Sequence, residues 1–578
     1  MNKFNWKIGG EAGFGIATTG LVFSKIASRL GYQIFDYIEY PSLIRGGHNS
    51  YEVVVSDEEV FGLKHPIDYL ICLNKDTFNF HKDRLHKDSF VVYDKDEFEI
   101  EENYKKVTVP FNKIIKDNQG QPVMKNTVAL GASLALLGAD LNVLNEIISE
   151  RFDKKGETVI NFNQRFAGEG YNYIKENYSS LIRPLLINKQ ASKKLVMTGN
   201  DAFALGSVIA DCRMYAAYPM TPSSSVLHTL ASWQKTTGMV VRHAEDEIAV
   251  INTALGASFA GVRAAVGTSG GGFALMVETV SLAGITETPV VIFISQRPGP
   301  ATGMPTWTEQ GDLLFTVHSG HGEFPKIVLA PGDQEEMIEL TAKAFNLADI
   351  YQTPVFVLSD MYLSESHKTV SYDFISKFAS VYRVNRGKIS NLKSQISKPN
   401  LKTQNFLRYK ITDDGVSERL IPGTKGFFYQ ANSYEHLEDG HTTESSFERN
   451  RQVEKRNRKT QSYLKQDFQM PRIYGDINKA SVVFVSWGST KGPILEAMNM
   501  LTAKGRRTAL IHFNHIYPLD ENKLTQLFIR KKRHILVENN STGQFGRLLR
   551  QEAGINIIEK ILKYDGRPFW PEEIVNKI

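Results

Sequence analysis

The chain has 578 residues, of which 42% are hydrophobic and 23% are charged, as in globular proteins. This length is too great for one hydrophobic core and indicates about three to four domains. The net charge of +5 gives no reason to expect a nucleic-acid partner. No apolar run approaches the ~18 residues of a membrane span, and the first residues lack the apolar core of a signal peptide. We therefore expect a cytoplasmic protein.

The chain contains only two cysteines, Cys72 and Cys212. A cubane iron–sulfur cluster takes four thiolates, so this chain cannot hold one by itself. No Cys-x-x-Cys or zinc-ligand spacing occurs either. Both cysteines lie in apolar or helical stretches, which favours buried free thiols. We expect no metal ion to be held by this chain alone.

The first unit, residues 1–185, opens with a strand at 4–8, a glycine loop at 9–15 and a helix at 16–30. This order presents backbone N–H groups to phosphate oxygens. The loop lacks the strict dinucleotide spacing, so a simple tight turn is an equal alternative. A second loop places Arg45 beside paired glycines and ahead of a strand at 50–55, which favours an anion site.

Residues 186–193 are polar and predict a linker. From 194 to 365 strands and helices alternate, which predicts a doubly wound, mostly parallel α/β sheet. Ligands of such sheets bind at the carboxyl ends of the strands.

The stretch 242–312 carries most of the chemistry. An acidic cluster opens a helix in which we expect one apolar face, formed by Ile248, Ile251, Leu255 and Phe259. A helix N-terminus favours acids for dipole reasons alone, which accounts for Glu245 and Asp246. Glu247 instead adjoins the apolar face, and a buried carboxylate needs a partner or a function.

A strand at 263–266, a turn at 268–272, a helix at 273–283 and a strand at 290–295 follow. Arg297 closes the last strand and suits a substrate carboxylate; the alternative is a structural ion pair with one of the acids. Ser269, in the turn, either contacts a ligand or caps the next helix.

Residues 366–470 are irregular. Their basic stretch, 449–459, predicts a solvated helix, with a phosphate or partner contact as the alternative. Residues 471–578 form a last α/β unit with strands at 480–487, 508–513 and 533–538. The segment 488–492 lacks the upstream glycine of a P-loop, so we expect no nucleotide hydrolysis.

Residues 242–312 resemble domain I of the 2-oxoacid:ferredoxin oxidoreductases, which use thiamine diphosphate. Upstream, Tyr-Pro-Met-Thr-Pro at 218–222 is similar to their Tyr-Pro-Ile-Thr-Pro signature. The glycine loops and Asn-Thr-Val-Ala-Leu-Gly-Ala at 126–132 resemble their γ domain. Ser-Trp-Gly-Ser and Glu-Asn-Asn-x-x-Gly-Gln in the last unit resemble their domain II, a transketolase-C-terminal-like module. This domain order is similar to the fused α subunit of 2-oxoglutarate:ferredoxin oxidoreductases.

The resemblance implies oxidative decarboxylation of a 2-oxoacid, 2-oxoglutarate by preference, with coenzyme A and ferredoxin. It implies that Glu247 binds the aminopyrimidine N1′ of thiamine and so promotes the imino tautomer, a general acid–base role. Thr221 and Arg297 would hold the oxoacid, and Ser269 and Gly270 would touch the cofactor. Candidate coenzyme A contacts are Gly10, Gly13, Gly15 and Arg45, although the γ domain alternatively serves to build the assembly.

The family's diphosphate and Mg²⁺ site begins with Gly-Asp-Gly, which this sequence lacks. We therefore expect a β subunit that supplies that site and a 4Fe–4S cluster, in an (αβ)₂ heterotetramer. Three alternatives stay open: pyruvate, a branched-chain or an aryl 2-oxoacid as substrate; a non-catalytic assembly subunit; and a thiamine-dependent decarboxylase without electron transfer.

Overall fold

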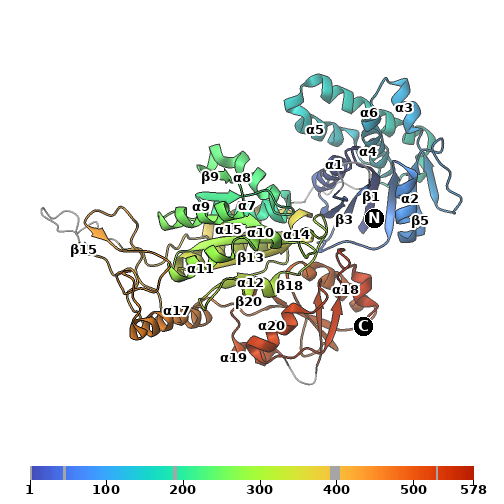
Figure 1. The fold of residues 1–578 in the computed structure, drawn as a ribbon. Helices are drawn as coiled ribbons and strands as arrows, with labels where there is room; N and C mark the ends of the chain where they lie inside the picture. The colour runs from blue at the N-terminus through green and yellow to red at the C-terminus, as the bar shows by residue number, and fades with distance from the viewer. Residues whose placement is uncertain (1–2, 43–46, 186–191, 391–403, 529–531) are drawn as a thin grey trace.

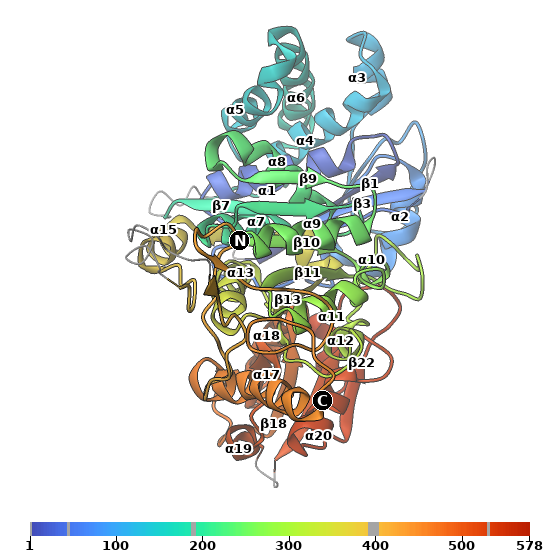
Figure 2. The same cartoon turned by 60° about the vertical axis from the view of Figure 1, so that its left-hand side comes forward.

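The computed structural model describes residues 3–42, 47–185, 192–390, 404–528 and 532–578. Three α/β units follow one another along the chain, each built on its own main sheet. Figure 1 shows the first unit in blue, the second in green and the third in red. In Figure 2 helices of the first unit stand at the top and the third unit lies at the bottom. The α/β fold class expected from the sequence is confirmed.

The first unit contains the eight-stranded sheet, in the order β6-β5-β4-β1-β3-β2-β14-β7. Trp6 stacks on Phe23 of α1 with ring centroids 4.1 Å apart, in a core buried between sheet and helices. The elements from the first unit's own stretch of sequence are β1 (Lys3–Glu11), α1 (Ile16–Arg29), β2 (Gln33–Glu39), β3 (His48–Ser56), β4 (Ile67–Cys72), α2 (Lys75–His81), β5 (Leu85–Tyr93), β6 (Lys105–Thr108), α3 (Phe111–Asp117), α4 (Lys125–Leu136), α5 (Leu141–Phe152) and α6 (Glu157–Asn177).

Two strands that follow the linker in sequence also belong to this sheet. β7 (Lys194–Thr198) pairs antiparallel with β14 (His367–Ser371), and β14 pairs with β2. The first strand after the linker therefore extends the sheet of the first unit, and the second unit is joined to the first by backbone hydrogen bonds as well as by the chain.

The second unit has a seven-stranded sheet, in the order β20-β12-β13-β11-β10-β8-β9. All its strands run parallel except β20, which comes from the third unit. The central strands β10 and β11 are buried throughout, as expected where helices cover both faces. The strands are β8 (Met214–Ala217), β9 (Val240–His243), β10 (Ala264–Thr268), β11 (Val290–Gln296), β12 (Ile327–Leu329), β13 (Pro354–Asp360) and β20 (His515–Tyr517). The helices are α7 (Gly199–Ile209), α8 (Ser224–Thr237), α9 (Glu247–Phe259), α10 (Gly270–Phe273), α11 (Val277–Ile285), α12 (Leu313–Val317), α13 (Gln334–Tyr351), α14 (Met361–Glu365) and α15 (Tyr372–Val381).

The buried face of α9 differs from the predicted one. Ile251 and Leu255 are buried, but Ile248 is 51% exposed and Phe259 is 37% exposed. The face packed inward instead includes Glu247 and small residues such as Ala254, because the helix lies close to its neighbours there. The buried face of α9 that was predicted from hydrophobicity alone is therefore wrong for Ile248 and Phe259 and correct for Ile251 and Leu255. The helix predicted at 273–283 is also wrong in extent, since α10 ends at Phe273 and α11 starts at Val277.

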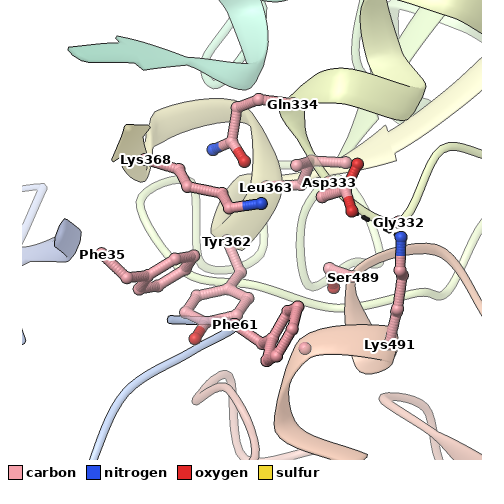
Figure 3. A pocket seen from close by; sticks show the side chains of 11 residues that line it. Phe35, Phe61, Gly332, Asp333, Gln334, Tyr362, Leu363, Lys368, Ser489 and Lys491 are labelled. Atoms are coloured by element: carbon pink, nitrogen blue, oxygen red, sulfur yellow. Dashed lines mark hydrogen bonds and ion pairs between the residues drawn. The ribbon is translucent and has the colours of Figure 1, made fainter. Parts of the chain in front are cut away.

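The third unit has a five-stranded sheet, in the order β17-β19-β18-β21-β22. Its elements are β17 (Arg472–Tyr474), β18 (Val482–Trp487), α18 (Lys491–Ala503), β19 (Thr508–Phe513), α19 (Glu521–Leu524), β21 (Arg533–Glu538), α20 (Gln544–Ala553), β22 (Glu559–Leu562) and α21 (Pro571–Val575). One apolar core spans the second and third units. Figure 3 shows where all three units meet: Phe61 from the first, Asp333 from the second and Lys491 from the third line one small pocket, and Lys491 pairs with Asp333 at 2.5 Å.

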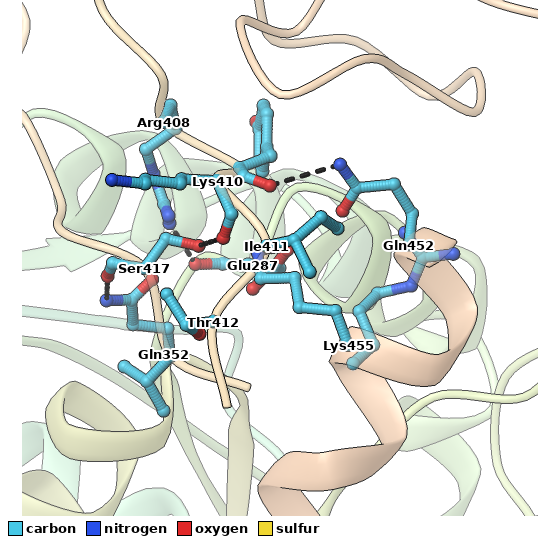
Figure 4. A network of polar contacts seen from close by, with 12 residues as sticks. Glu287, Gln352, Arg408, Lys410, Ile411, Thr412, Ser417, Gln452 and Lys455 are labelled. Carbon is cyan, nitrogen blue, oxygen red and sulfur yellow. Dashed lines mark hydrogen bonds and ion pairs between the residues drawn. The ribbon is translucent and has the colours of Figure 1, made fainter. Parts of the chain in front are cut away.

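The irregular connection carries β15 (Gln404–Asn405), β16 (Phe427–Phe428) and α17 (Ser446–Gln466). The predicted helix is present, but the prediction that its basic face is solvated is wrong. Lys455 and Lys459 are buried, and the Nζ of each lies 2.6 Å from the carboxylate of Glu287, which is also buried. Figure 4 shows Lys455 and Glu287 within this network. Arg408 donates to the backbone carbonyl of Glu287 at 2.7 Å. A charge run in a sequence cannot reveal a buried counter-ion far away in the chain.

Two further properties concern the chain as a whole. Cys72 and Cys212 are buried free thiols, as predicted. Among the described residues, no helix is long and apolar enough to cross a bilayer.

Candidate active site

The candidate residues of the second unit gather at the carboxyl edge of its sheet. Thr221 follows β8, Ser269 follows β10 and Arg297 follows β11, while Glu247 begins α9 directly after β9. Because these strands are parallel, their carboxyl ends share one edge, where α/β proteins bind ligands.

Glu247 is the buried acid of its cluster. Asp246 caps α9 by accepting a hydrogen bond from the Ala249 N–H at 2.7 Å, and Glu245 is exposed. Glu247 is only 4% exposed, and its Oε1 has no hydrogen-bond partner among the described residues. A buried carboxylate oxygen without a donor costs free energy unless a ligand supplies one. The geometry therefore fits a bound group that presents a donor here, such as a protonated or tautomerising ring nitrogen.

The turn after β10 packs tightly against this acid. A methyl group added at Gly272 would lie 2.5 Å from Glu247 Oε1 and 2.2 Å from Thr268 Oγ1. Ser269 is completely buried, and its side chain makes no capping bond to α10, so the capping alternative is wrong. Its Oγ has no partner in the described chain. Two buried polar atoms without a hydrogen-bond partner among the described residues, Glu247 Oε1 and Ser269 Oγ, therefore adjoin the same glycine turn.

Arg297 and Thr221 lie together. The Arg297 Nη1 donates to the backbone carbonyl of Thr221 at 2.7 Å. Burial lowers the pKa of Arg297, and the charge of Asp312 partly offsets this. Within the described ranges Arg297 forms no ion pair with an acid, so its guanidinium keeps donors for another anion.

Asp312 and Glu309 are acids of this site that sequence reasoning missed. A methyl group at Gly270 would lie 2.4 Å from Asp312 Oδ2, so this carboxylate rests directly on the turn. Burial raises the pKa of Asp312 to about 6, against the influence of Arg297. Burial, followed by the charge of Asp312, raises the pKa of Glu309 to about 7. Their only sequence signal is their place after a Pro/Gly loop that starts at Arg297, and acids in such loops are ordinarily solvated.

The third unit fixes the loop that carries both acids. Gln310, between them, donates to the carbonyl of Trp487 at 2.9 Å and accepts from the Asn539 N–H at 2.9 Å. Asn540 donates to the Gln310 carbonyl at 3.0 Å, and Gln544 donates to the Gly311 carbonyl at 2.6 Å. The Glu-Asn-Asn-x-x-Gly-Gln segment of the third unit therefore holds a loop of the second unit in place.

The candidates of the first unit form a separate group. Gly10 lies inside β1, so the loop predicted at 9–15 begins later than expected. Gly13 and Gly15 have φ of 99° and 71°, in the left-handed region that favours glycine. Asn126 donates to the Phe14 carbonyl at 2.8 Å and holds this loop. Arg45 lies outside the described residues.

A cavity of about 300 Å³ adjoins Gly15, between α1, α4, α5 and α6. Gly10 and Gly13 do not line it. Among the described residues, no three His, Cys, Asp or Glu side chains are grouped so that they could hold a metal ion.

Comparisons with known proteins cover all three units. The family model described as pyruvate flavodoxin/ferredoxin oxidoreductase, thiamine diP-bdg, matches residues 206–455. The model for pyruvate ferredoxin/flavodoxin oxidoreductase matches residues 5–173, and the transketolase C-terminal domain matches residues 476–561.

Some relatives match nearly the whole length of this chain, and others match part of it. The 2-oxoacid:ferredoxin oxidoreductase subunit alpha of Sulfolobus sp is 32% identical over 99% of this chain and 96% of its own. The 2-oxoglutarate synthase subunit KorA of Methanothermobacter thermautotrophicus is 30% identical over 67% of this chain and 98% of its own. The solved 2-oxoglutarate:ferredoxin oxidoreductase from Magnetococcus marinus, with 2-oxoglutarate, coenzyme A and succinyl-CoA bound, aligns over 100% of this chain and 99% of that chain, with a TM-score of 0.91 and 30% identity. The chain therefore belongs to the family of 2-oxoacid:ferredoxin oxidoreductase alpha subunits and is an oxidoreductase of that class.

Proposed function

We propose that this chain is the α subunit of a 2-oxoglutarate:ferredoxin oxidoreductase that works only with a β subunit. The single observation that carries the proposal is Glu247, a buried acid with an unpartnered Oε1 at the carboxyl edge of the sheet. The named substrate of the Magnetococcus marinus enzyme and of the KorA relative supports 2-oxoglutarate over pyruvate, a branched-chain or an aryl 2-oxoacid.

Thiamine diphosphate, when bound, supplies the nucleophilic carbon and the electron sink for decarboxylation. Glu247 then shares a proton with the N1′ of the pyrimidine, as a general acid–base. Arg297 binds the carboxylate of the oxoacid, and Thr221 orients it. Ser269 and Gly270 contact the cofactor from the turn. Burial of Glu247 and Ser269 would limit the access of water to the groups that they contact.

A partner chain completes the site. The sequence lacks the Gly-Asp-Gly diphosphate motif and has two cysteines, too few for a cubane cluster. We propose that a β subunit supplies the diphosphate and Mg²⁺ site and a 4Fe–4S cluster, passes electrons to ferredoxin, and assembles as (αβ)₂. Exposed apolar side chains on β9, on α9 and on the loops after β8, α9 and α10 offer it a surface: Tyr218, Val240, Ile248, Phe259, Val262 and Leu275.

Coenzyme A would contact the first unit. The proposed residues are Gly10, Gly13, Gly15 and Arg45. The cavity beside Gly15 and the start of α1, which no side chain caps, support this placement, since a helix N-terminus favours phosphate. The coenzyme A bound to the Magnetococcus marinus enzyme supports coenzyme A as the co-substrate.

The test is to purify the chain with its partner, determine thiamine, magnesium and iron, and assay several 2-oxoacids with a one-electron dye. Glu247→Gln should lower turnover by at least ~10²-fold, the scale of general acid–base catalysis. Glu245→Gln, which changes an exposed acid two residues away, is the matched control and should stay within about twofold. Normal turnover of the Glu247→Gln complex would favour an assembly subunit. A complex that decarboxylates without iron would favour a decarboxylase.

A further inference from the structure

We propose that Asn200 is a positioning residue for binding of the 2-oxoacid, because its side-chain amide holds the turn that carries Thr221 and, through Thr221, Arg297. The inference rests on the proposed function, since that function assigns Thr221 and Arg297 to the oxoacid. It gives a role to a completely buried amide that lies directly behind this turn.

Asn200 lies at the start of α7, where the first and second units meet. β7, which ends at Thr198, belongs to the sheet of the first unit, and α7 packs against α14 of the second. A methyl group added at Gly199 would lie 2.3 Å from the carbonyl oxygen of Leu363 in α14, so the two backbones are in close contact here. Thr198 and Asp201 form a capping box that fixes the first turn of α7. The backbone that carries the Asn200 amide is therefore held on both sides.

The Asn200 amide donates toward the turn after β8. Its Nδ2 lies 2.8 Å from the carbonyl oxygen of Pro222, 2.7 Å from Ser225 Oγ and 3.0 Å from Glu365 Oε1. The Ser225 hydroxyl donates to Glu365 Oε1 at 3.3 Å. A backbone carbonyl only accepts hydrogen bonds, so the amide nitrogen must face Pro222, which fixes the orientation of the amide. The bond to Pro222 is the one that reaches the candidate site.

Two consecutive carbonyl groups of this turn are held by different side chains. The Thr221 carbonyl accepts from Arg297 Nη1 at 2.7 Å, and the Pro222 carbonyl accepts from Asn200 at 2.8 Å. Because each peptide group is planar, a rotation of the Pro222 carbonyl is passed to the adjoining backbone and displaces Thr221. Arg297 would move with the Thr221 carbonyl that it binds. Asn200 therefore acts on the oxoacid through Thr221 and Arg297.

The oxygen of the same amide has no partner. Asn200 Oδ1 is buried and forms no hydrogen bond within the part of the chain that the structure describes. A buried polar atom without a partner costs stability, so an apolar side chain would suit this position better if only packing mattered. The geometry therefore favours a role for the N–H groups of Asn200 over a role for its volume.

The test compares Asn200→Ala and Ser225→Ala with wild type in the reconstituted complex. Asn200→Ala should raise KM for 2-oxoglutarate about tenfold, the scale of one lost buried hydrogen bond, with kcat and the KM for coenzyme A changed much less. Equilibrium binding of N-oxalylglycine, an analogue of 2-oxoglutarate with a poorly reactive amide carbonyl, should weaken by the same factor. Ser225→Ala keeps the bond to Pro222; it is the matched control and should stay within about twofold.

Asn200→Asp gives a readout that a loss of packing would not give. The new carboxyl group would be buried beside Glu365, whose own pKa burial raises to about 7, with Asp201 and His367 as the other titratable groups nearby. Burial and like charge raise the pKa of such a carboxyl group. Its protonated form can donate to the Pro222 carbonyl, whereas its ionised form cannot. The KM of Asn200→Asp, divided by that of wild type, should therefore rise from about one at about pH 5 to about tenfold at about pH 9.

Three results would overturn the proposal: a KM of Asn200→Ala within about threefold of wild type, an equal rise of KM in Ser225→Ala, or a KM ratio of Asn200→Asp that does not change with pH. If Asn200→Ala does not assemble, the isosteric Asn200→Asp still decides. Assembly of neither variant would make Asn200 a folding residue and would also overturn it. Failure of the proposed function looks different, since the wild-type complex would then turn over no 2-oxoacid at any pH.

Discussion

Gly272→Ala tests whether the turn after β10 sets the position of the acid. The added methyl group would lie 2.2 Å from Thr268 Oγ1, 2.5 Å from Glu247 Oε1 and 2.8 Å from Glu247 Cγ. Ordinary carbon–oxygen contacts are roughly 1 Å longer, so the Glu247 carboxylate or the turn must move by that amount. A displacement of 1 Å in a catalytic group costs about 10²-fold in rate, and overpacking costs about 1–3 kcal/mol of stability.

The assay is turnover of the Gly272→Ala complex together with urea denaturation of the variant chain. We expect a folded chain with turnover reduced about 10²-fold. Gly168→Ala is the matched control, because it is also a helical glycine and an added methyl group meets nothing within 4 Å. It should keep its activity and gain about 0.5–1 kcal/mol of stability. Turnover of Gly272→Ala within threefold of wild type would refute the account of this turn.

Three further predictions concern buried charges and thiols. Glu287→Gln removes the anion between two buried lysines and should destabilise the chain by about 3–5 kcal/mol in urea denaturation, whereas exposed Glu278→Gln should have little effect. Burial alone would raise the pKa of Glu52, but Arg84 and Lys7 hold it at about 2, below its usual 4.5. The Glu52 carboxylate therefore contributes about 3 kcal/mol to the free energy of unfolding above pH 4.5, and this contribution is lost as the pH falls through 2. In Glu52→Gln the unfolding free energy, measured over the same pH range, should lack this pH-dependent contribution. An identical pH dependence in wild type and variant would contradict the prediction. Burial raises the pKa of Cys72 well above its usual value and that of Cys212 to about 12. A thiol reagent at pH 8 should thus label two cysteines only after denaturation, and rapid labelling of the native chain would contradict this.

The three α/β units could be predicted because their strands and helices alternate with clear local periodicity. Which sheet a strand joins could not, since β7 and β14 pair with the first unit through contacts remote in sequence. The orientation of α9 was missed for a related reason. Ile248 and Phe259 are apolar but exposed, and hydrophobicity alone does not show which apolar side chains of a helix are buried.

The candidate site could be predicted where a strand end or a motif marks a residue, as for Glu247, Thr221 and Arg297. Asp312 could not be found in this way. Its position depends on the loop before it, which is held by hydrogen bonds from Asn540 and Gln544, more than 200 residues further along the chain. The burial of Lys455 likewise depends on a distant Glu287. Local sequence records a charge but not the partner that removes it from solvent.

The most direct test of the central claim is the binding of thiamine diphosphate to this chain, measured by equilibrium titration with and without the β subunit in the presence of Mg²⁺. If Glu247 engages the pyrimidine while another chain engages the diphosphate, the isolated chain should bind the cofactor at least about 10²-fold more weakly than the complex does. Tight binding by the isolated chain, at the affinity of the complex, would contradict the account.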